Sequence, residues 1–309
     1  MSAEPIVAAL EVPVVERRRV VESTALADYW KLTKPEVNFL IVITTFAGFY
    51  LGCVAQSQDV PFLPLINVVL GTLLVASGAG TLNQYIERRF DAQMRRTARR
   101  PLAAGRLNAP AVLWFGITLS AAGSIYLAIA VNGLASLLAI FTLLSYLFLY
   151  TPLKRKTPIC TLVGAVPGAM PPLIGWAAAS GKLTFEAWTL FAVIFLWQFP
   201  HFMAIAWMYR DDYDRAGYVV LPHGHARPRF ATLQTVLPLL TLVPVSLFPV
   251  FTGQGSVFYS IGAMLLSLGF FYYGAHFAVH KSTSAARRLL AASIIYIPLL
   301  FALMILLRG

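Results

Sequence analysis

Charged residues are scarce in this chain of 309 residues. Only 12% of its side chains are charged, from 24 lysines and arginines and 13 aspartates and glutamates, whereas 58% are hydrophobic. A soluble domain averages about 25% charged and about 45–50% apolar residues. The polar side chains are too few to cover a water-soluble particle, so the composition predicts an integral membrane protein.

Cysteine is also nearly absent. Only Cys53 and Cys160 occur, each inside an apolar segment, which excludes a disulfide framework and a Cys-x-x-Cys metal motif. Both are expected to be small buried hydrophobic side chains. The sequence shows no Ser-His-Asp or Cys-His pattern of the kind that indicates nucleophilic catalysis.

The N-terminal residues 1–28 lack a long apolar run, which argues against a signal peptide. Their four glutamates argue against a mitochondrial transit peptide. We therefore expect a disordered cytosolic tail over residues 1–28 and one transmembrane domain over residues 29–309.

Nine apolar runs follow the tail, each close to the roughly 20 residues that a helix needs to cross a hydrocarbon core. Helices are expected because a spanning segment must satisfy its own backbone hydrogen bonds, and the runs do not alternate in polarity as strands would. The expected fold class is therefore all-α, a polytopic membrane protein with nine transmembrane helices. The predicted spans are Val37–Ala55, Phe62–Leu82, Ala111–Val131, Gly133–Tyr150, Ile159–Ala179, Ala187–Tyr209, Phe230–Phe251, Val257–Val279 and Leu289–Leu307.

The net charge of +11 is distributed as in a membrane protein rather than a nucleic-acid-binding one. Of the 24 lysines and arginines, 22 fall in the tail or in the gaps after the second, fourth, sixth and eighth runs. Only Lys182 and Arg308 fall on the other side. Because basic residues accumulate in cytosolic segments, the pattern predicts a cytosolic N-terminus and an external C-terminus.

The first polar motif stands at the end of the second run, where Asn83, Glu87 and Asp91 are spaced by four. If the helix continues, the three side chains share one face. Their oxygens suit Mg²⁺, which takes a few carboxylates and completes its shell with phosphate and water. The arginines that follow, including Arg99 and Arg100, suit the oxygens of a diphosphate. Ordinary ion pairs along a solvated helix would also explain this segment.

The second polar motif follows the sixth run and holds Asp211, Asp212 and Asp214. It lies on the same predicted side of the membrane as the first motif. Ionisable groups near membrane depth are rare and usually functional, although a solvated acidic turn neutralised by Arg210 and Arg215 is the alternative. Together the two acidic motifs predict one site, in a central cavity open to the cytosolic side.

Basic residues that would suit a diphosphate recur at other cytosolic helix ends. They could equally be explained by the accumulation of positive charge in cytosolic loops. The candidates for binding a diphosphate are Lys34, Arg88, Arg99, Arg100, Lys154, Arg155 and Arg210.

These segments resemble the UbiA-type intramembrane prenyltransferase superfamily, and most closely the branch of it that farnesylates protohaem IX. The similarity covers about residues 28–222 in the expected order. Two strings within it, over residues 164–169 and 197–202, resemble the haem-directed branch specifically. The matching segments are Leu32-Thr-Lys-Pro35, Asn83-Gln-Tyr-Ile-Glu-Arg-Arg-Phe-Asp91, Arg96-Thr-Ala-Arg-Arg-Pro-Leu102, Tyr150-Thr-Pro-Leu-Lys-Arg-Lys-Thr157, Gly164-Ala-Val-Pro-Gly-Ala-Met-Pro-Pro172, Trp197-Gln-Phe-Pro-His-Phe202 and Asp211-Asp-Tyr-Asp-Arg-Ala-Gly-Tyr218.

The resemblance implies an enzyme that transfers a farnesyl group from farnesyl diphosphate to a vinyl group of haem B, with Mg²⁺ as cofactor. It implies a bacterial plasma membrane location, contact with membrane lipid, and a downstream haem A synthase as a partner. The metal would be held by Asn83, Glu87, Asp91, Asp211, Asp212 and Asp214, of which all but Asp214 are also expected to be catalytic. The haem or a carbocation would contact Tyr85, Tyr150, Trp197 and His201, although helix packing also explains these four.

Two departures from the family pattern affect the predicted metal site. The family usually has aspartate where Glu87 stands, and glutamate keeps the charge but adds one methylene. In the second motif Arg215 occupies the position four after Asp211, which leaves open which of the three aspartates bind metal. Two rival hypotheses are a superfamily member with another acceptor, and a secondary transporter, whose charged residues and broken helices would lie near the midplane.

Overall fold

The computed structural model describes residues 24–252 and 255–307, and within them every regular element is helical. Nine helical stretches in this part of the chain are long and apolar enough to span a membrane, which confirms the expected all-α class. The elements are α1 (Ala25–Leu32), α2 (Pro35–Val54), α3 (Phe62–Asp91), α4 (Ala109–Ala130), α5 (Gly133–Leu144), the π-helical η1 (Ser145–Tyr150), α6 (Thr151–Leu153), α7 (Cys160–Gly168), α8 (Met170–Ser180), α9 (Phe185–Met208), α10 (Arg210–Arg215), α11 (Ala226–Ser246), α12 (Phe248–Phe251), α13 (Val257–His280) and α14 (Thr283–Leu306).

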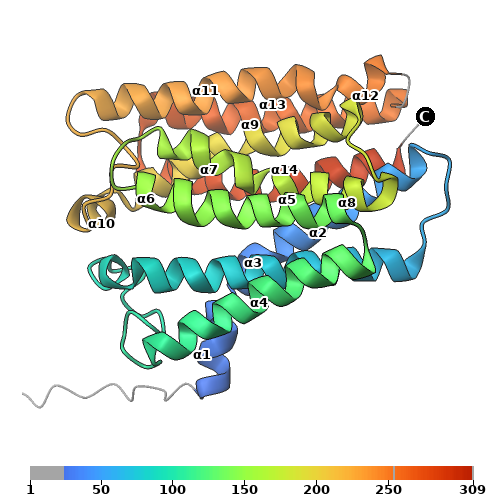
Figure 1. The fold of residues 1–309 in the computed structure, drawn as a ribbon. Coiled ribbons are helices and arrows are strands. Elements are labelled where there is room, and N and C mark those ends of the chain that lie inside the picture. The colour runs from blue at the N-terminus through green and yellow to red at the C-terminus, as the bar shows by residue number, and fades with distance from the viewer. Residues whose placement is uncertain (1–23, 253–254, 308–309) are drawn as a thin grey trace, which may run out of the picture.

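The long helices lie side by side in one bundle (Figure 1). Helix α3 packs along α4 and α2 along α8, while α9 contacts both α11 and α14, and α13 contacts the same two helices. The connection between α3 and α4, the short α6 and the short α10 gather at one end of the bundle, and the C-terminus lies at the other (Figure 1). We call the end that carries α10 the acidic end.

Glycine allows a close helix contact between α2 and α8. A Cβ at Gly48 would fall on the backbone carbonyl of Pro172, and a Cβ at Gly175 would fall on that of Thr45. Small residues at helix interfaces let backbones approach in lipid, where packing rather than water exclusion drives association. The outward faces of α4 and α13 are instead apolar and exposed, as at Ile129 and Phe258, which suits contact with lipid tails.

The helix starts follow local capping chemistry rather than hydropathy alone. Thr24 caps α1, so that Ala25–Leu32 is helical although we expected a disordered tail as far as residue 28; residues 1–23 lie outside the described part. Ser282 caps α14, which therefore includes Arg287 and Arg288, placed by the sequence in a gap between spans. The fifth span is also two helices, because α7 ends at Gly168 and α8 begins at Met170 among closely spaced prolines.

Lys34 has an unusual backbone conformation between α1 and α2. Its φ of 54° and ψ of 62° are left-handed, which is uncommon for a residue other than glycine. The next residue, Pro35, opens α2, and a residue before proline is disfavoured in the right-handed helical region. This turn directs the Lys34 side chain toward α3, where its Nζ donates to the Asn83 Oδ1 at 2.9 Å. Strain of this kind tends to occur at functional sites.

Candidate active site

The first polar motif is a buried column on one face of α3. The helix continues to Asp91, so the spacing of four brings Asn83, Glu87 and Asp91 onto one face as expected, and all three are buried. The Asn83 Nδ2 donates to the Glu87 Oε2 at 2.9 Å, and also approaches the Thr151 hydroxyl at 3.2 Å. Three oxygen-bearing side chains thus stand in line inside the protein rather than on a solvated surface.

Each buried carboxylate of α3 has a cationic partner. Arg100 donates to both carboxylate oxygens of Asp91, and Lys154 contacts the Glu87 Oε1. Buried charges are stable only when they are paired in this way. With Lys34 beside Asn83, three basic side chains face two carboxylates, so these five side chains carry one positive charge in excess when Lys34 is protonated.

Burial strongly affects Lys34. Its pKa is lowered to about 7, mainly because burial removes the ammonium group from water and also because of the positive charges of Arg100 and Lys154, while Glu87 and Asp91 act in the opposite direction. An anion placed near this ammonium would favour its charged form. The local environment is therefore suited to a negatively charged ligand.

The three aspartates of the second motif point in different directions. Asp212 is 9% exposed, and its Oδ2 accepts a hydrogen bond from the Arg96 backbone N–H at 3.1 Å. Asp211 is 83% exposed, and Asp214 is 38% exposed and pairs with Arg227 at 2.8 Å. Only Asp212 therefore faces the loop that follows α3.

The predicted basic residues also separate into two groups. Lys34, Arg100 and Lys154 lie among the buried oxygens of α3. The others lie on the periphery, where Arg88 stacks on Tyr85 with 4.4 Å between the guanidinium carbon and the ring centroid, and Arg155 stacks on Phe90 at 4.0 Å. Arg210 donates to the Trp207 carbonyl, and Arg99 is exposed.

Tyr218 is a site residue that motif spacing did not single out. Its hydroxyl donates to the Glu87 Oε1 at 2.9 Å, and the side chain is buried. Burial, and the nearby charge of Glu87, raise the pKa of Tyr218, which keeps it a hydrogen-bond donor. The tyrosine ends the second motif string, but nothing in the sequence indicates that it reaches α3.

The two strings typical of the haem-directed branch meet inside the bundle. The Gln198 Nε2 of α9 donates to the Ala165 carbonyl of α7 at 3.0 Å, and a Cβ at Gly168 would fall on the Gln198 amide. On the face of α9 toward α14, the Trp197 indole N–H donates to the Ser293 carbonyl at 2.8 Å. The ring of His201 stacks on Trp197 with 4.8 Å between centroids.

These two aromatic residues lie deeper than the acids. His201 stands seven residues before Met208, the last residue of α9, which at 1.5 Å per residue is about 10 Å along the helix. Tyr150 lies nearer the acidic end, where its ring contacts Gly164 and stands 4.8 Å from the Lys154 Nζ. Tyr85 is engaged by Arg88 on the other side of α3.

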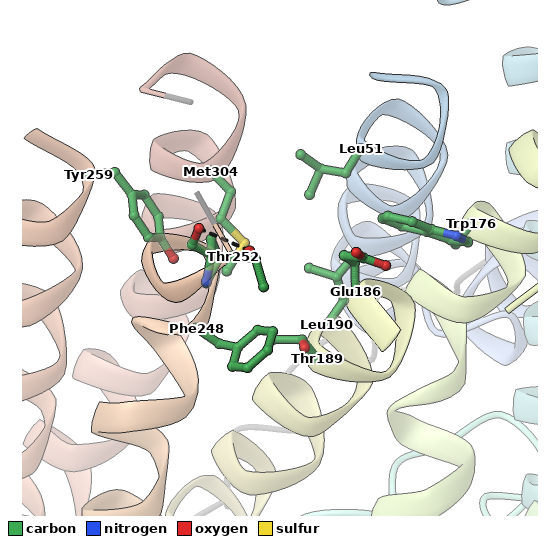
Figure 2. Close-up of a pocket in the computed structure, with 10 residues that line it drawn as sticks. Leu51, Trp176, Glu186, Thr189, Leu190, Phe248, Thr252, Tyr259 and Met304 are labelled. Carbon is green, nitrogen blue, oxygen red and sulfur yellow. Dashed lines mark hydrogen bonds between the residues drawn. The ribbon is translucent and has the colours of Figure 1, made fainter. Parts of the chain in front are cut away.

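Two hollows lie away from the acids of α3 and α10. A groove of about 650 Å³ runs between α2, α3 and α14 and has a wholly apolar lining that includes Phe46, Leu73 and Phe301. A smaller pocket of about 40 Å³ lies near the start of α9, where Glu186 and Trp176 line it (Figure 2). The small pocket adjoins none of the acids of α3 or α10, so it is not the expected diphosphate site.

The donor set fits Mg²⁺ bound together with a phosphate ligand. Among the described residues, no three His, Cys, Asp or Glu side chains lie close enough to enclose a metal alone. Mg²⁺ does not need such a cage, because it usually binds one or two carboxylates and takes its remaining ligands from phosphate and water. Glu87, Asp91 and the amide of Asn83 provide that partial set, and all three are buried where water competes little.

A helical membrane bundle with a buried carboxylate column and surrounding cations at one end is the arrangement that the resemblance to intramembrane prenyltransferases implies. The model of the UbiA prenyltransferase family matches residues 41–303, and the chain belongs to this family.

Curated relatives are similar over almost the whole chain. A protoheme IX farnesyltransferase of Solibacter usitatus is 47% identical over 287 residues, which are 91% of this chain and 98% of the relative. The protein of the same name from Salinibacter ruber is 42% identical over 91% of this chain and 98% of the relative. That of Koribacter versatilis is 40% identical over 92% of this chain and 94% of the relative.

Solved structures share the fold at low sequence identity. A digeranylgeranylglyceryl phosphate synthase superposes with a TM-score of 0.72 at 18% identity, over 91% of this chain and 97% of the other. A UbiA homolog from Archaeoglobus fulgidus, bound to GPP and Mg²⁺, superposes with a TM-score of 0.61 at 15% identity, over 90% and 99% of the two chains. The likeness places this chain among multi-pass membrane proteins of one fold.

Proposed function

We propose that this chain transfers the farnesyl group of farnesyl diphosphate to a vinyl group of protohaem IX (haem B), which yields haem O. The main support is that the two haem-branch strings pack together at Gln198, in a chain 47% identical to a protoheme IX farnesyltransferase. The buried column of Asn83, Glu87 and Asp91 supplies oxygens of the kind that a metal-bound diphosphate requires.

Asn83, Glu87 and Asp91 would hold Mg²⁺, and Asp212 is the acid of α10 that bonds to the loop after α3. Bound Mg²⁺ would neutralise the negative charge that develops on the departing diphosphate. The inward direction of Asp212, and the exposure of Asp211 and Asp214, favour Asp212 over its two neighbours for this role. The excess positive charge of Lys34, Arg100 and Lys154 would balance the diphosphate oxygens.

The reaction breaks the bond between C1 of the farnesyl chain and the diphosphate oxygen, and the diphosphate leaves with the electron pair. The π electrons of the haem vinyl group then form the new carbon–carbon bond to C1. Water adds to the remaining carbocation and loses a proton, which gives the hydroxyethylfarnesyl side chain. The aromatic rings of Tyr150 and Trp197 would stabilise the carbocation by cation–π contact, and the surrounding apolar helices would exclude bulk water.

The apolar groove suits the farnesyl chain. It runs along α3, the helix that also carries the carboxylate column, and is lined by α2 and α14 on its other sides. Its volume of about 650 Å³ lies within the roughly 300–1,000 Å³ of small-molecule sites. A hydrocarbon chain in this groove would keep its diphosphate toward the acidic end and its tail among lipid-like side chains.

His201 suits the iron of protohaem. The Ser293 hydroxyl donates its one proton to the Leu290 carbonyl at 2.6 Å, so it accepts from the His201 Nδ1–H at 2.8 Å. The His201 Nε2 therefore carries the lone pair, which is the form of imidazole that binds metal. In this arrangement the porphyrin would lie beside α9, deeper in the membrane than the carboxylates of α3.

The acidic end faces the cytosol, because the positive-inside rule assigns the basic helix ends to that side. The central cavity of the expected fold would open there, with the N-terminus on the same side and the C-terminus outside. The bacterial relatives favour the plasma membrane as the location. A haem A synthase is the enzyme class expected to receive the product.

The test is direct analysis of the product. Membranes that contain the protein are supplied with haem B, farnesyl diphosphate and Mg²⁺, and extracted haems are analysed by mass. The proposal expects the mass increase of one farnesyl group plus one hydroxyl group, together with Mg²⁺-dependent release of diphosphate. Diphosphate release with unmodified haem would indicate a prenyltransferase for another acceptor, and no release would contradict prenyl transfer from farnesyl diphosphate.

A further inference from the structure

Tyr218 lies where the two acidic segments of the protein meet. It follows α10 by three residues. Its hydroxyl nevertheless reaches Glu87, the middle residue of the α3 column, at 2.9 Å from the Oε1 atom. The side chain is 3% exposed. The contact therefore joins the segment that carries Asp212 to the segment that carries Glu87, across 131 residues of sequence.

The backbone holds Tyr218 rigidly. Its N–H donates to the Tyr213 carbonyl at 2.9 Å, and the following Val219 N–H donates to the Lys154 carbonyl at 2.7 Å. Its ring also packs edge-on against Phe90, with 6.1 Å between centroids, and against Tyr213 at 5.9 Å. The direction of the hydroxyl is thus fixed by both the loop and its aromatic neighbours.

The hydrogen bonds of Glu87 divide unequally between its two oxygens. Oε1 meets both the Tyr218 hydroxyl and the Lys154 ammonium group, while Oε2 accepts one bond, from the Asn83 Nδ2 at 2.9 Å. Each carboxylate oxygen offers about two acceptor positions. The second position of Oε2 is therefore the one that these contacts leave for a metal ion.

Lys154 and Tyr218 differ in how firmly they can hold Oε1. An ammonium group on a flexible stem can turn toward diphosphate oxygens when the substrate binds, whereas the tyrosine hydroxyl is fixed by its surroundings. We propose that Tyr218 is a positioning residue, which orients the Glu87 carboxylate for Mg²⁺ when diphosphate draws Lys154 away. This inference rests on the proposed function, since it assumes that Glu87 meets the metal.

The test uses Tyr218→Phe, which removes the hydroxyl and keeps the ring. Binding is followed by Mn²⁺ electron paramagnetic resonance in detergent with farnesyl diphosphate present, and by Mg²⁺-dependent thermal stabilisation. We expect metal affinity to fall about tenfold, as is typical when a partner of a metal ligand is lost. The metal-free melting temperature should change as little as in the control Tyr259→Phe, which removes another buried hydroxyl far from α10.

A double-mutant cycle with Glu87→Asp distinguishes positioning from a general structural effect. The shorter side chain withdraws the carboxylate from Tyr218, so Tyr218→Phe should then change metal affinity less than twofold. If the two substitutions lower metal affinity by factors that multiply, or if Tyr218→Phe binds metal with wild-type affinity, the inference about Tyr218 is overturned while the proposed function stands. If the wild-type protein binds no Mn²⁺ with farnesyl diphosphate, the proposed function itself fails.

Discussion

One guanidinium nitrogen of Arg100 donates to both carboxylate oxygens of Asp91, at 2.9 and 2.8 Å, across nine residues of sequence. The bond closes the loop that follows α3 back onto the end of the helix. The Thr97 hydroxyl strengthens this closure by donating to the Asp91 carbonyl at 2.8 Å. Asp91 therefore both shapes the loop and holds a charge at the candidate metal site.

Removal of the negative charge of Asp91 should slow the reaction strongly. We expect Asp91→Asn to lower turnover roughly 100-fold or more, because a neutral amide no longer stabilises the charged centre of the reaction. Diphosphate release from purified protein at saturating substrate measures the loss. Because Arg100 loses its carboxylate partner in this variant, the amount of folded protein in the membrane is measured beside turnover, and turnover is expressed per folded molecule. Wild-type turnover would contradict a metal role for Asp91.

The acids of α10 offer a matched pair of variants. Asp212→Asn should lower turnover roughly 100-fold, because it removes a buried carboxylate that faces the α3 loop. Asp211→Asn should stay within about twofold of wild type, because the Asp211 side chain is 83% exposed and surface substitutions usually have small effects. The same diphosphate assay measures both, and an equal loss in the two variants would contradict the assignment to Asp212.

The contact between α7 and α9 predicts a stability effect. A Cβ at Gly168 would fall on the Gln198 amide. That amide is buried and can move aside only by losing its bond to the Ala165 carbonyl, so the substitution should cost about 1–3 kcal/mol. Gly168→Ala should therefore lower the melting temperature in detergent. Gly269→Ala is the control, because Gly269 lies on exposed α13 surface with no heavy atom within 4 Å of an added Cβ. Equal melting temperatures for the two variants would contradict the packing argument.

Hydropathy and spacing predicted the architecture because lipid and helix geometry leave few choices. Each span needs a long apolar helical stretch, so the nine runs located the nine spans found in the part of the chain that the structure describes. A helix that continues through Asp91 places residues four apart on one face. The start of α14 was missed because its cap, Ser282, precedes the apolar run by several polar residues. Scans of hydropathy detect the apolar part of a helix and not its cap.

The sequence could not predict where the side chains of short segments point. Helix α10 has six residues between two bends, so its register on the bundle depends on tertiary contacts such as the Arg96 N–H bond to Asp212. Tyr218 depends likewise on the bond between Val219 and Lys154, which joins two loops distant in sequence. No periodic pattern encodes contacts of that kind.

Loss of His201 should weaken the binding of haem B and leave the binding of farnesyl diphosphate unchanged. In His201→Ala the imidazole Nε2 is absent, so we expect binding of haem B to weaken about tenfold or more and its Soret band to lose the wild-type position. Stabilisation by Mg²⁺ and farnesyl diphosphate should persist, because His201 lies seven residues inside the end of α9 and has its hydrogen bond with Ser293 rather than with an acid. A haem titration followed by absorbance, beside a thermal melt with farnesyl diphosphate, gives both measurements. An unchanged Soret band with normal haem affinity would contradict an iron contact, whereas loss of both bindings would indicate that His201 only supports the packing of α9 on α14.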